Sequence, residues 1–261
     1  HTMKNCLKQN LICRNTSKIL RLKQKQISMA VFMSKRLKLI LRKRKFWSHF
    51  KEFEMREVVY VGESLQGLLK GMSEKQQAYV SEMFHFYMEE YKELRVSNDA
   101  ESVSEAIHKA IDDSIKETAS DSEDEISCRK GCSFCCYQRV DISEDEATLI
   151  TAYSKEIGLE IPYDRLSRQE EAKSYTDLPF QEKRCAFLND EDACSIYDHR
   201  PSACRKLLVV SEPSLCDVEK NPNGRIKKLV SLEAEVIASS SLNARPSGRM
   251  SKMLLAKKPK L

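Results

Sequence analysis

Four cysteines within nine residues constrain this chain of 261 residues more than any other feature of its sequence. They are Cys128, Cys132, Cys135 and Cys136, in the segment CRKGCSFCC. Protein cores use cysteines singly, whereas zinc ions and iron–sulfur clusters are commonly held by four thiolates. Gly131 favours a tight turn between them, because glycine tolerates positive φ. The segment therefore predicts a metal site built from thiolates.

The adjacent pair Cys135 and Cys136 raises a question of its own. In an extended chain, neighbouring side chains point to opposite sides. Either the two cysteines serve two different centres, or one of them is a ligand and the other is packed. The sequence leaves both interpretations open.

A second group of cysteines follows at Cys185, Cys194, Cys204 and Cys216. Short strands are expected at 185–188 and 194–197, because a polar turn separates two apolar segments, and this hairpin would bring Cys185 near Cys194. Cys204 falls early in a short helix opened by Pro201, where the positive end of the helix dipole favours a thiolate. We therefore expect all eight cysteines from 128 to 216 to be metal ligands, and we exclude Cys6 and Cys13.

Three charged or polar side chains lie beside the second group. Arg200 and Arg205 either offset the negative charge of the sulfurs or are solvated surface charges. His199 is expected to be an ordinary surface histidine, since eight thiols already suffice as ligands.

The cellular compartment decides between metal ligation and disulfides. The sequence shows no secretory cleavage pattern. The longest apolar run near the start, 29–33, is far shorter than the roughly 18–20 residues that span a bilayer. We therefore expect a cytoplasmic protein whose thiols stay reduced and bind zinc or iron, either as ions or as an iron–sulfur cluster.

Charge divides the chain into two regions. Residues 1–50 contain 14 of the 44 Lys and Arg residues and no acidic residue. The other 30 Lys and Arg residues and all 39 Asp and Glu residues lie after residue 50. We expect 1–71 to be a basic arm that is disordered or not native, with Met72 an attractive true start, and 72–261 to be the metal-binding domain. Such an arm could touch nucleic acid or an anionic membrane surface.

Helical signals occupy most of the chain after Met72. Capping sequences and apolar stripes predict helices at 73–95, 102–118, 144–157, 164–175 and 225–242. The predicted fold class is mostly α: a small helical domain with a short β-hairpin or irregular cysteine-rich region that binds metal.

These residues resemble the YkgJ-type cysteine-cluster proteins, described as zinc- or iron-chelating domains. The resemblance rests on CRKGCSFCC at 128–136, RCAFL at 184–188, CSIYDHRPSACR at 194–205 and SLEAEVIASSSLNA at 231–244. It implies that the seven cysteines from Cys128 to Cys204 are cluster cysteines, and that Arg200, Pro201 and Arg205 are motif residues. The cysteine core is also similar to that of flagellin lysine N-methylases, which implies a role accessory to protein modification.

Three functions remain in competition at this point. The chain is a metal- or cluster-binding protein, an iron–sulfur redox protein or oxidoreductase, or an interaction module with structural zinc and a nucleic-acid-binding arm. No Ser-His-Asp set, paired-carboxylate site or phosphate loop names a substrate. The sequence therefore leaves open whether the protein is an enzyme.

Overall fold

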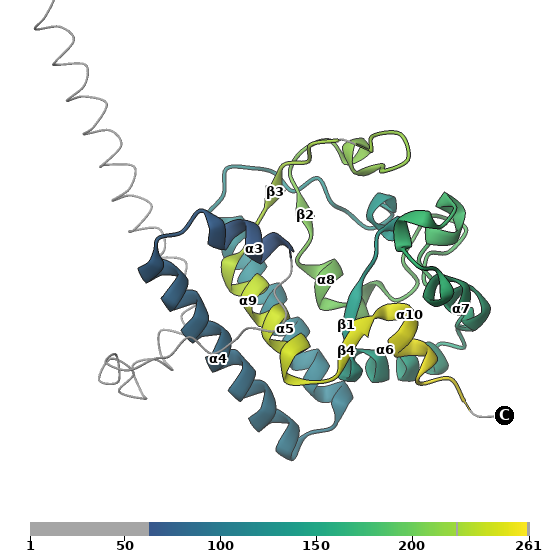
Figure 1. Cartoon of the computed structure of the whole chain (residues 1–261), viewed down its shortest axis with the longest axis horizontal. Coiled ribbons are helices and arrows are strands. Elements are labelled where there is room, and N and C mark those ends of the chain that lie inside the picture. Colours follow the sequence, from purple (N-terminus) through teal and green to yellow (C-terminus); the bar gives the residue numbers. More distant parts are fainter. Residues whose placement is uncertain (1–62, 223, 260–261) are drawn as a thin grey trace, which may run out of the picture. The chain divides into compact units, whose positions relative to one another are not determined.

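The computed structural model describes residues 63–222 and 224–259, and most of their regular structure is helical (Figure 1). The helices are α3 (Glu63–Lys70), α4 (Glu74–Ser97), α5 (Ala100–Ser120), α6 (Glu144–Glu156), α7 (Tyr163–Glu171), α8 (Ser202–Arg205), α9 (Leu232–Ala244) and α10 (Met250–Leu255). The strands are short: β1 (Asp141–Ser143), β2 (Leu208–Val209), β3 (Lys228–Leu229) and β4 (Ser247–Arg249). This confirms the predicted fold class.

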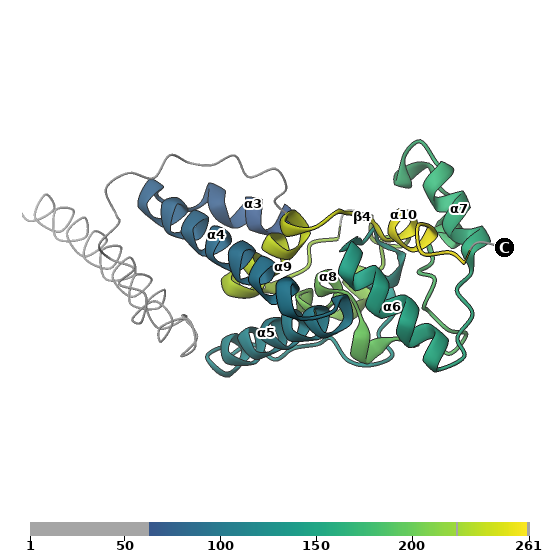
Figure 2. The same cartoon turned by 90° about the horizontal axis from the view of Figure 1, so that it is seen from below.

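Helices α4, α5 and α9 form a bundle (Figures 1 and 2). Ser73 caps α4 in a capping box with Gln76, as the sequence predicted, and Asp99 caps α5 by accepting the Ser102 N–H. Apolar side chains from all three helices make up the core of the bundle. Its buried members are Tyr91, Val103, Ile107, Ile111, Ala234, Ile237 and Ala238. Burial of these stripes holds the bundle together.

A second core lies between α6, α7, α10 and the loops that contain the later cysteines. Phe187 and Ile196, which flank Cys194, are 2% and 0% exposed. The other buried members are Ile142, Ala147, Ile150, Ile161, Leu166, Met250, Met253 and Leu254. Cys185 and Cys194 pack against this core. Part of the cysteine region is therefore supported by apolar burial.

Two small antiparallel sheets join distant segments. In the first, β1 pairs with β4, with Ile142 opposite Gly248. In the second, β2 pairs with β3, with Val209 opposite Lys228. The first sheet connects the segment after the cysteine cluster to the C-terminal helices, and the second closes the loop that contains Cys216.

Several predicted boundaries move in the structure. Helix α5 begins at Ala100, because Asp99 caps it ahead of the expected start at Ser102. The helix predicted at 225–242 begins only at Leu232, since Ser231 is its cap and β3 occupies the segment before it. The predicted 164–175 helix is shorter and ends at Glu171. The expected hairpin consists of one isolated bridge between Leu188 and Cys194 around the polar turn.

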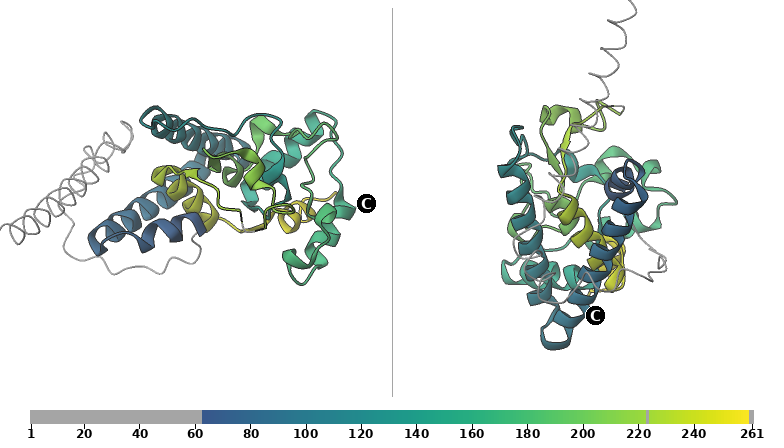
Figure 3. Two further views of the ribbon diagram at one scale, coloured as in Figure 1. Left: turned by 90° about the horizontal axis from the view of Figure 1, so that it is seen from above. Right: turned by 90° about the vertical axis from the view of Figure 1, so that its left-hand side faces the viewer.

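Helix α3 lies inside the segment that the sequence assigned to the arm. Its Leu65 is 1% exposed, and the helix contacts α9 (Figure 3). Residues 1–62, with Cys6, Cys13 and the basic stretch, lie outside the described residues. The expectations that the arm is disordered or not native, and that it could touch nucleic acid, therefore stay predictions. Among the described helices, none is long and apolar enough to cross a membrane.

Candidate metal centre

The first cysteines lie in a compact turn. Gly131 has φ of +88°, and the Cys132 N–H donates to the Arg129 carbonyl at 3.0 Å, so a tight turn follows Cys128 as glycine at this position predicted. A single 3-10 helix, η2 (Phe134–Tyr137), then presents Cys135 and Cys136. In a 3-10 helix, successive side chains point about 120° apart. The two adjacent thiols therefore face different directions.

Strand β2 positions Cys128. The Ser127 N–H donates to the Val209 carbonyl at 2.8 Å, and the Val209 N–H donates to the sulfur of Cys128 at 3.2 Å. A backbone N–H aimed at a sulfur stabilises the thiolate, which is the form that binds metal.

Cys216 approaches from the other direction. It ends the 3-10 helix η6 (Pro213–Cys216), which contacts η2, and it is 8% exposed. Burial raises the pKa of Cys216, and the nearby thiols of Cys128, Cys132 and Cys135 raise it further. The segment of Cys216 thus lies against the first cysteine motif.

The segment of Cys185 also meets η2. The Cys185 N–H donates to the Cys136 carbonyl at 2.7 Å. The bridge between Leu188 and Cys194 then folds the chain back, as the predicted hairpin required. Burial raises the pKa of Cys185 to about 12, and the thiols of Cys194 and Cys135 add to the effect. Burial likewise raises the pKa of Cys204 well above its usual range, with contributions from Cys185, Cys135 and Cys194.

The two thiols of η2 interact directly. A hydrogen bond from the Cys136 thiol, together with a smaller contribution from Arg200, lowers the pKa of Cys135 to about 7. The same hydrogen bond, followed by burial, raises the pKa of Cys136. The pair therefore favours the thiolate at Cys135 over the thiolate at Cys136.

The short helix α8, which contains Cys204, is held by buried polar groups. Glu146, 3% exposed, accepts the Ser202 N–H at 2.7 Å and lies 3.1 Å from His108 Nε2. Arg205 is 6% exposed and pairs with Asp112 at 2.6 Å. A helix of four residues has little stability of its own, so these contacts to α5 and α6 fix its position.

The two arginines of the motif have different surroundings. Arg205 also donates to the backbone carbonyls of Asp198 and Arg200, so its charge holds the loop together. Arg200 lies 4.1 Å over the Tyr197 ring and lowers the pKa of both Cys135 and Cys194. Of these two arginines, Arg200 is thus the one that offsets negative charge on the sulfurs. The ring of His199, which the sequence predicted to be an ordinary surface histidine, is partly buried and packs on Tyr153 with 4.1 Å between centroids.

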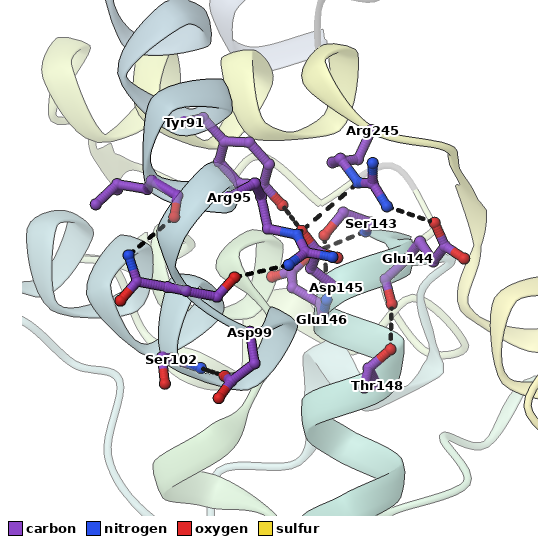
Figure 4. A network of polar contacts seen from close by, with 12 residues as sticks. Tyr91, Arg95, Asp99, Ser102, Ser143, Glu144, Asp145, Glu146, Thr148 and Arg245 are labelled. Carbon is purple, nitrogen blue, oxygen red and sulfur yellow. Dashed lines mark hydrogen bonds and ion pairs between the residues drawn. The ribbon is translucent and has the colours of Figure 1, made fainter.

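A polar network at the start of α6 connects this region to the bundle (Figure 4). Ser143 and Glu146 form the capping box that the sequence predicted. Asp145, 1% exposed, accepts the Tyr91 hydroxyl at 2.7 Å and pairs with Arg95 at 3.1 Å. Sequence reasoning found Asp145 and Glu146 only as helix-start residues. Their second role depends on partners that are distant in the sequence.

The eight described cysteines are all free thiols, and none forms a disulfide. Their donor chemistry fits a soft metal, since thiolate is the preferred ligand of zinc and of iron–sulfur clusters. In the described part of the chain, however, no three Cys, His, Asp or Glu side chains are gathered tightly enough to hold an ion. The thiols lie in one region without forming a closed coordination shell, so metal binding requires their side chains to move.

Residues 127–223 match the model of the CxxCxxCC family, described as a putative zinc- or iron-chelating domain. This confirms the family resemblance found in the sequence, over the region that contains all eight clustered cysteines. Neither the comparison with curated proteins nor that with solved structures gave a match.

Proposed function

We propose that this protein binds zinc or iron through the thiolates of the eight cysteines between Cys128 and Cys216. One observation supports this most strongly. Segments far apart in the sequence bring free thiols near η2, where burial and then neighbouring thiols raise the pKa values of Cys216 and Cys204. A group of mutually repelling, partly buried thiolates is unfavourable by itself, and a soft cation relieves the repulsion.

The residues would act on a bound metal in distinct ways. The cysteines would hold it, the Val209 N–H would stabilise the sulfur of Cys128, and Arg200 would offset excess negative charge. Zinc would supply a structural cross-link, whereas an iron–sulfur cluster would supply one-electron chemistry. The described cysteine side chains are equally suitable ligands for zinc and for an iron–sulfur cluster.

The decisive experiment is elemental analysis with an acid-labile sulfide assay on anaerobically purified protein. We expect zinc or iron in near-stoichiometric amounts. Iron with sulfide and a visible absorption band would identify a cluster and favour a redox role, whereas zinc without sulfide would favour a structural site. Metal-free protein whose eight thiols all react in the folded state would refute the proposal.

A matched control distinguishes the cluster from other thiols. Replacement of Cys6 and Cys13 by Ser should leave the metal content unchanged, because these cysteines lie outside the matched region. Replacement of Cys132 or Cys204 by Ser should lower it, since oxygen is a poorer ligand for a soft site.

The cellular role is proposed on weaker grounds than the ligands. The proposed thiolate ligands require reduced cysteines, which favours a cytoplasmic location. The similarity of the cysteine core to flagellin lysine N-methylases favours a role accessory to protein modification. Cell fractionation combined with alkylation of free thiols tests the location: recovery of fully oxidised protein from an exported fraction would contradict it.

A further inference from the structure

We propose that residues 172–184, the cover segment, act as a lid that controls access to the thiols of Cys136 and Cys185. The cover segment joins α7 to the later cysteines and lies against η2. Its regular structure consists of the 3-10 helices η3 (Tyr175–Asp177) and η4 (Phe180–Lys183). Its role in metal entry rests on the proposed function, whereas its covering of the two thiols does not.

Both ends of the cover segment are held at α7. One end follows directly from Glu171, the last residue of that helix. At the other end, the buried amide of Gln169 donates to the carbonyls of Glu182 and Arg184, at 2.8 and 3.1 Å, and Arg168 pairs with Glu182 at 2.9 Å. A surface loop whose ends lie close together in this way is an Ω-loop. The base of the cover segment is therefore fixed, while its middle reaches η2.

An aromatic contact closes the cover segment onto η2. The ring of Phe180 stacks on that of Tyr137, which follows Cys136 directly, with 4.4 Å between centroids and 10° between the ring planes. The Tyr175 hydroxyl donates to the Lys183 carbonyl at 2.8 Å and lies 3.4 Å from the Tyr137 carbonyl. One stacked pair and a few neutral hydrogen bonds make a weak contact. Local opening therefore breaks it far more readily than it unfolds the helices.

The two thiols lie where the cover segment meets η2. Cys136 immediately precedes Tyr137, and the N–H of Cys185, the first residue after the cover segment, donates to the Cys136 carbonyl at 2.7 Å. Both cysteines are partly buried. Cys128 has a different contact, because its sulfur accepts the N–H of Val209 in β2. Opening of the cover segment should therefore expose Cys136 and Cys185 more than Cys128.

Movement of the cover segment would also serve metal binding. The side chains of the described residues are not gathered tightly enough to hold an ion, so ligation requires the thiols to move. Because Cys185 is joined directly to the cover segment, its position relative to Cys136 changes when that segment opens. We therefore expect metal to enter and leave through the open form.

The test is the rate at which N-ethylmaleimide alkylates each cysteine of the full-length protein as purified, followed by peptide mass spectrometry. Phe180→Ala removes the stacked ring, so Cys136 and Cys185 should react about tenfold faster, since the rate follows the population of the open form. Phe180→Tyr keeps the ring and should react at nearly the wild-type rate. Cys128 and Cys216 should react at unchanged rates in both variants.

A double variant shows whether the effect passes through the aromatic contact. Tyr137→Ala removes the other ring and should accelerate the alkylation of Cys185 about as much as Phe180→Ala does. The double variant should be no faster than either single variant, because both substitutions break the same contact. Two effects that multiply in the double variant would mean that the rings act separately, and would overturn the inference.

The other outcomes separate the cover segment from general loosening and from the proposed function. Unchanged rates in Phe180→Ala, or equal acceleration at all eight cysteines, would overturn the inference. Release of bound metal to a chelator should accelerate in Phe180→Ala by about the same factor as alkylation, and unchanged release would overturn the role in metal entry. Protein purified without metal would refute the proposed function, and the alkylation rates would still decide whether residues 172–184 cover the thiols.

Discussion

The α4–α5–α9 bundle and the first cysteine motif are stabilised by different physics. The bundle buries apolar stripes and satisfies its helix ends with capping residues, so its local and tertiary preferences agree. The segment from Cys128 to Tyr137 has one 3-10 turn, and strand β2, whose Val209 N–H donates to the Cys128 sulfur, has two residues. None of its four cysteines is fully buried.

The later cysteines lie between these two extremes. Phe187 and Ile196 anchor Cys185 and Cys194 to an apolar core that the sequence pattern did not reveal. A bound metal should therefore matter to different degrees for the two groups of cysteines. The first group has little apolar burial to hold it, whereas burial partly organises Cys185 and Cys194.

Removal of metal should give the largest effect and should separate these regions. Structural zinc contributes on the order of 10–16 kcal/mol of apparent binding energy in small zinc peptides, and this energy becomes folding energy where no preformed site exists. With a chelator present, hydrogen exchange should accelerate most at 128–137 and 213–216, less at 185–196, and least in α4, α5 and α9. Equal acceleration everywhere would mean a single cooperative unit, and no acceleration would mean that the metal is not structural.

Shortening a core side chain should affect the two cores differently. Phe187→Ala should destabilise the protein by about 3–5 kcal/mol and should also weaken metal binding by the second group. Ile111→Ala, in the bundle core, should cost about 2–5 kcal/mol with metal affinity unchanged. Urea unfolding and competition with a chromophoric chelator measure the two quantities. If both variants bind metal with unchanged affinity, the apolar support of Cys185 and Cys194 has no effect on the site.

Glu146→Gln tests the polar support of α8. Removing one partner of a buried charged pair costs about 3–5 kcal/mol, and here it would also release the helix that contains Cys204. The exposed Glu156→Gln on the same helix is the matched control, with an expected change within about 0.5 kcal/mol. A wild-type-like urea midpoint for Glu146→Gln would show that α8 does not need this carboxylate.

The same residue predicts a pH dependence with a definite sign. Burial pushes the pKa of Glu146 up, but His108 and the N–H groups of Ser202 and Ser143 outweigh it, so the folded-state pKa lies below the ordinary 4.5. The stabilisation is therefore complete above pH 4.5 and is lost as the pH falls through the folded-state value. The stability difference between wild type and Glu146→Gln should shrink in acid, as urea unfolding at several pH values would show. A difference that grows in acid would contradict this.

Truncation at the N-terminus should give the smallest effect. A chain that starts at Glu63 should keep its metal and its thermal transition, because the arm's charge pattern offers little apolar surface to bury. A chain that starts at Met72 also loses α3 and the buried Leu65, which should cost roughly 1.5–3 kcal/mol. Equal loss in both chains would show that residues before Glu63 pack on the domain.

Local signals account for the parts of the structure that the sequence predicted. The capping boxes at Ser73 and Ser143 and the turn at Gly131 each involve residues within a few positions of one another. Local chemistry decides such features, and they appear as expected. The thiol inventory and its preference for a soft metal are equally independent of the fold.

What the tertiary structure decided depends on partners far apart in the chain. Strands β1 and β4 pair across more than a hundred residues, β3 displaces the start of the last long predicted helix, and Glu146 reaches both α5 and α8. No periodicity within one segment encodes such pairings, because the polar groups of each segment find their hydrogen-bond partners only in the other segment. The sequence by itself predicted that thiols would bind metal; only the folded chain decided that the segments of Cys185 and Cys216 lie against η2.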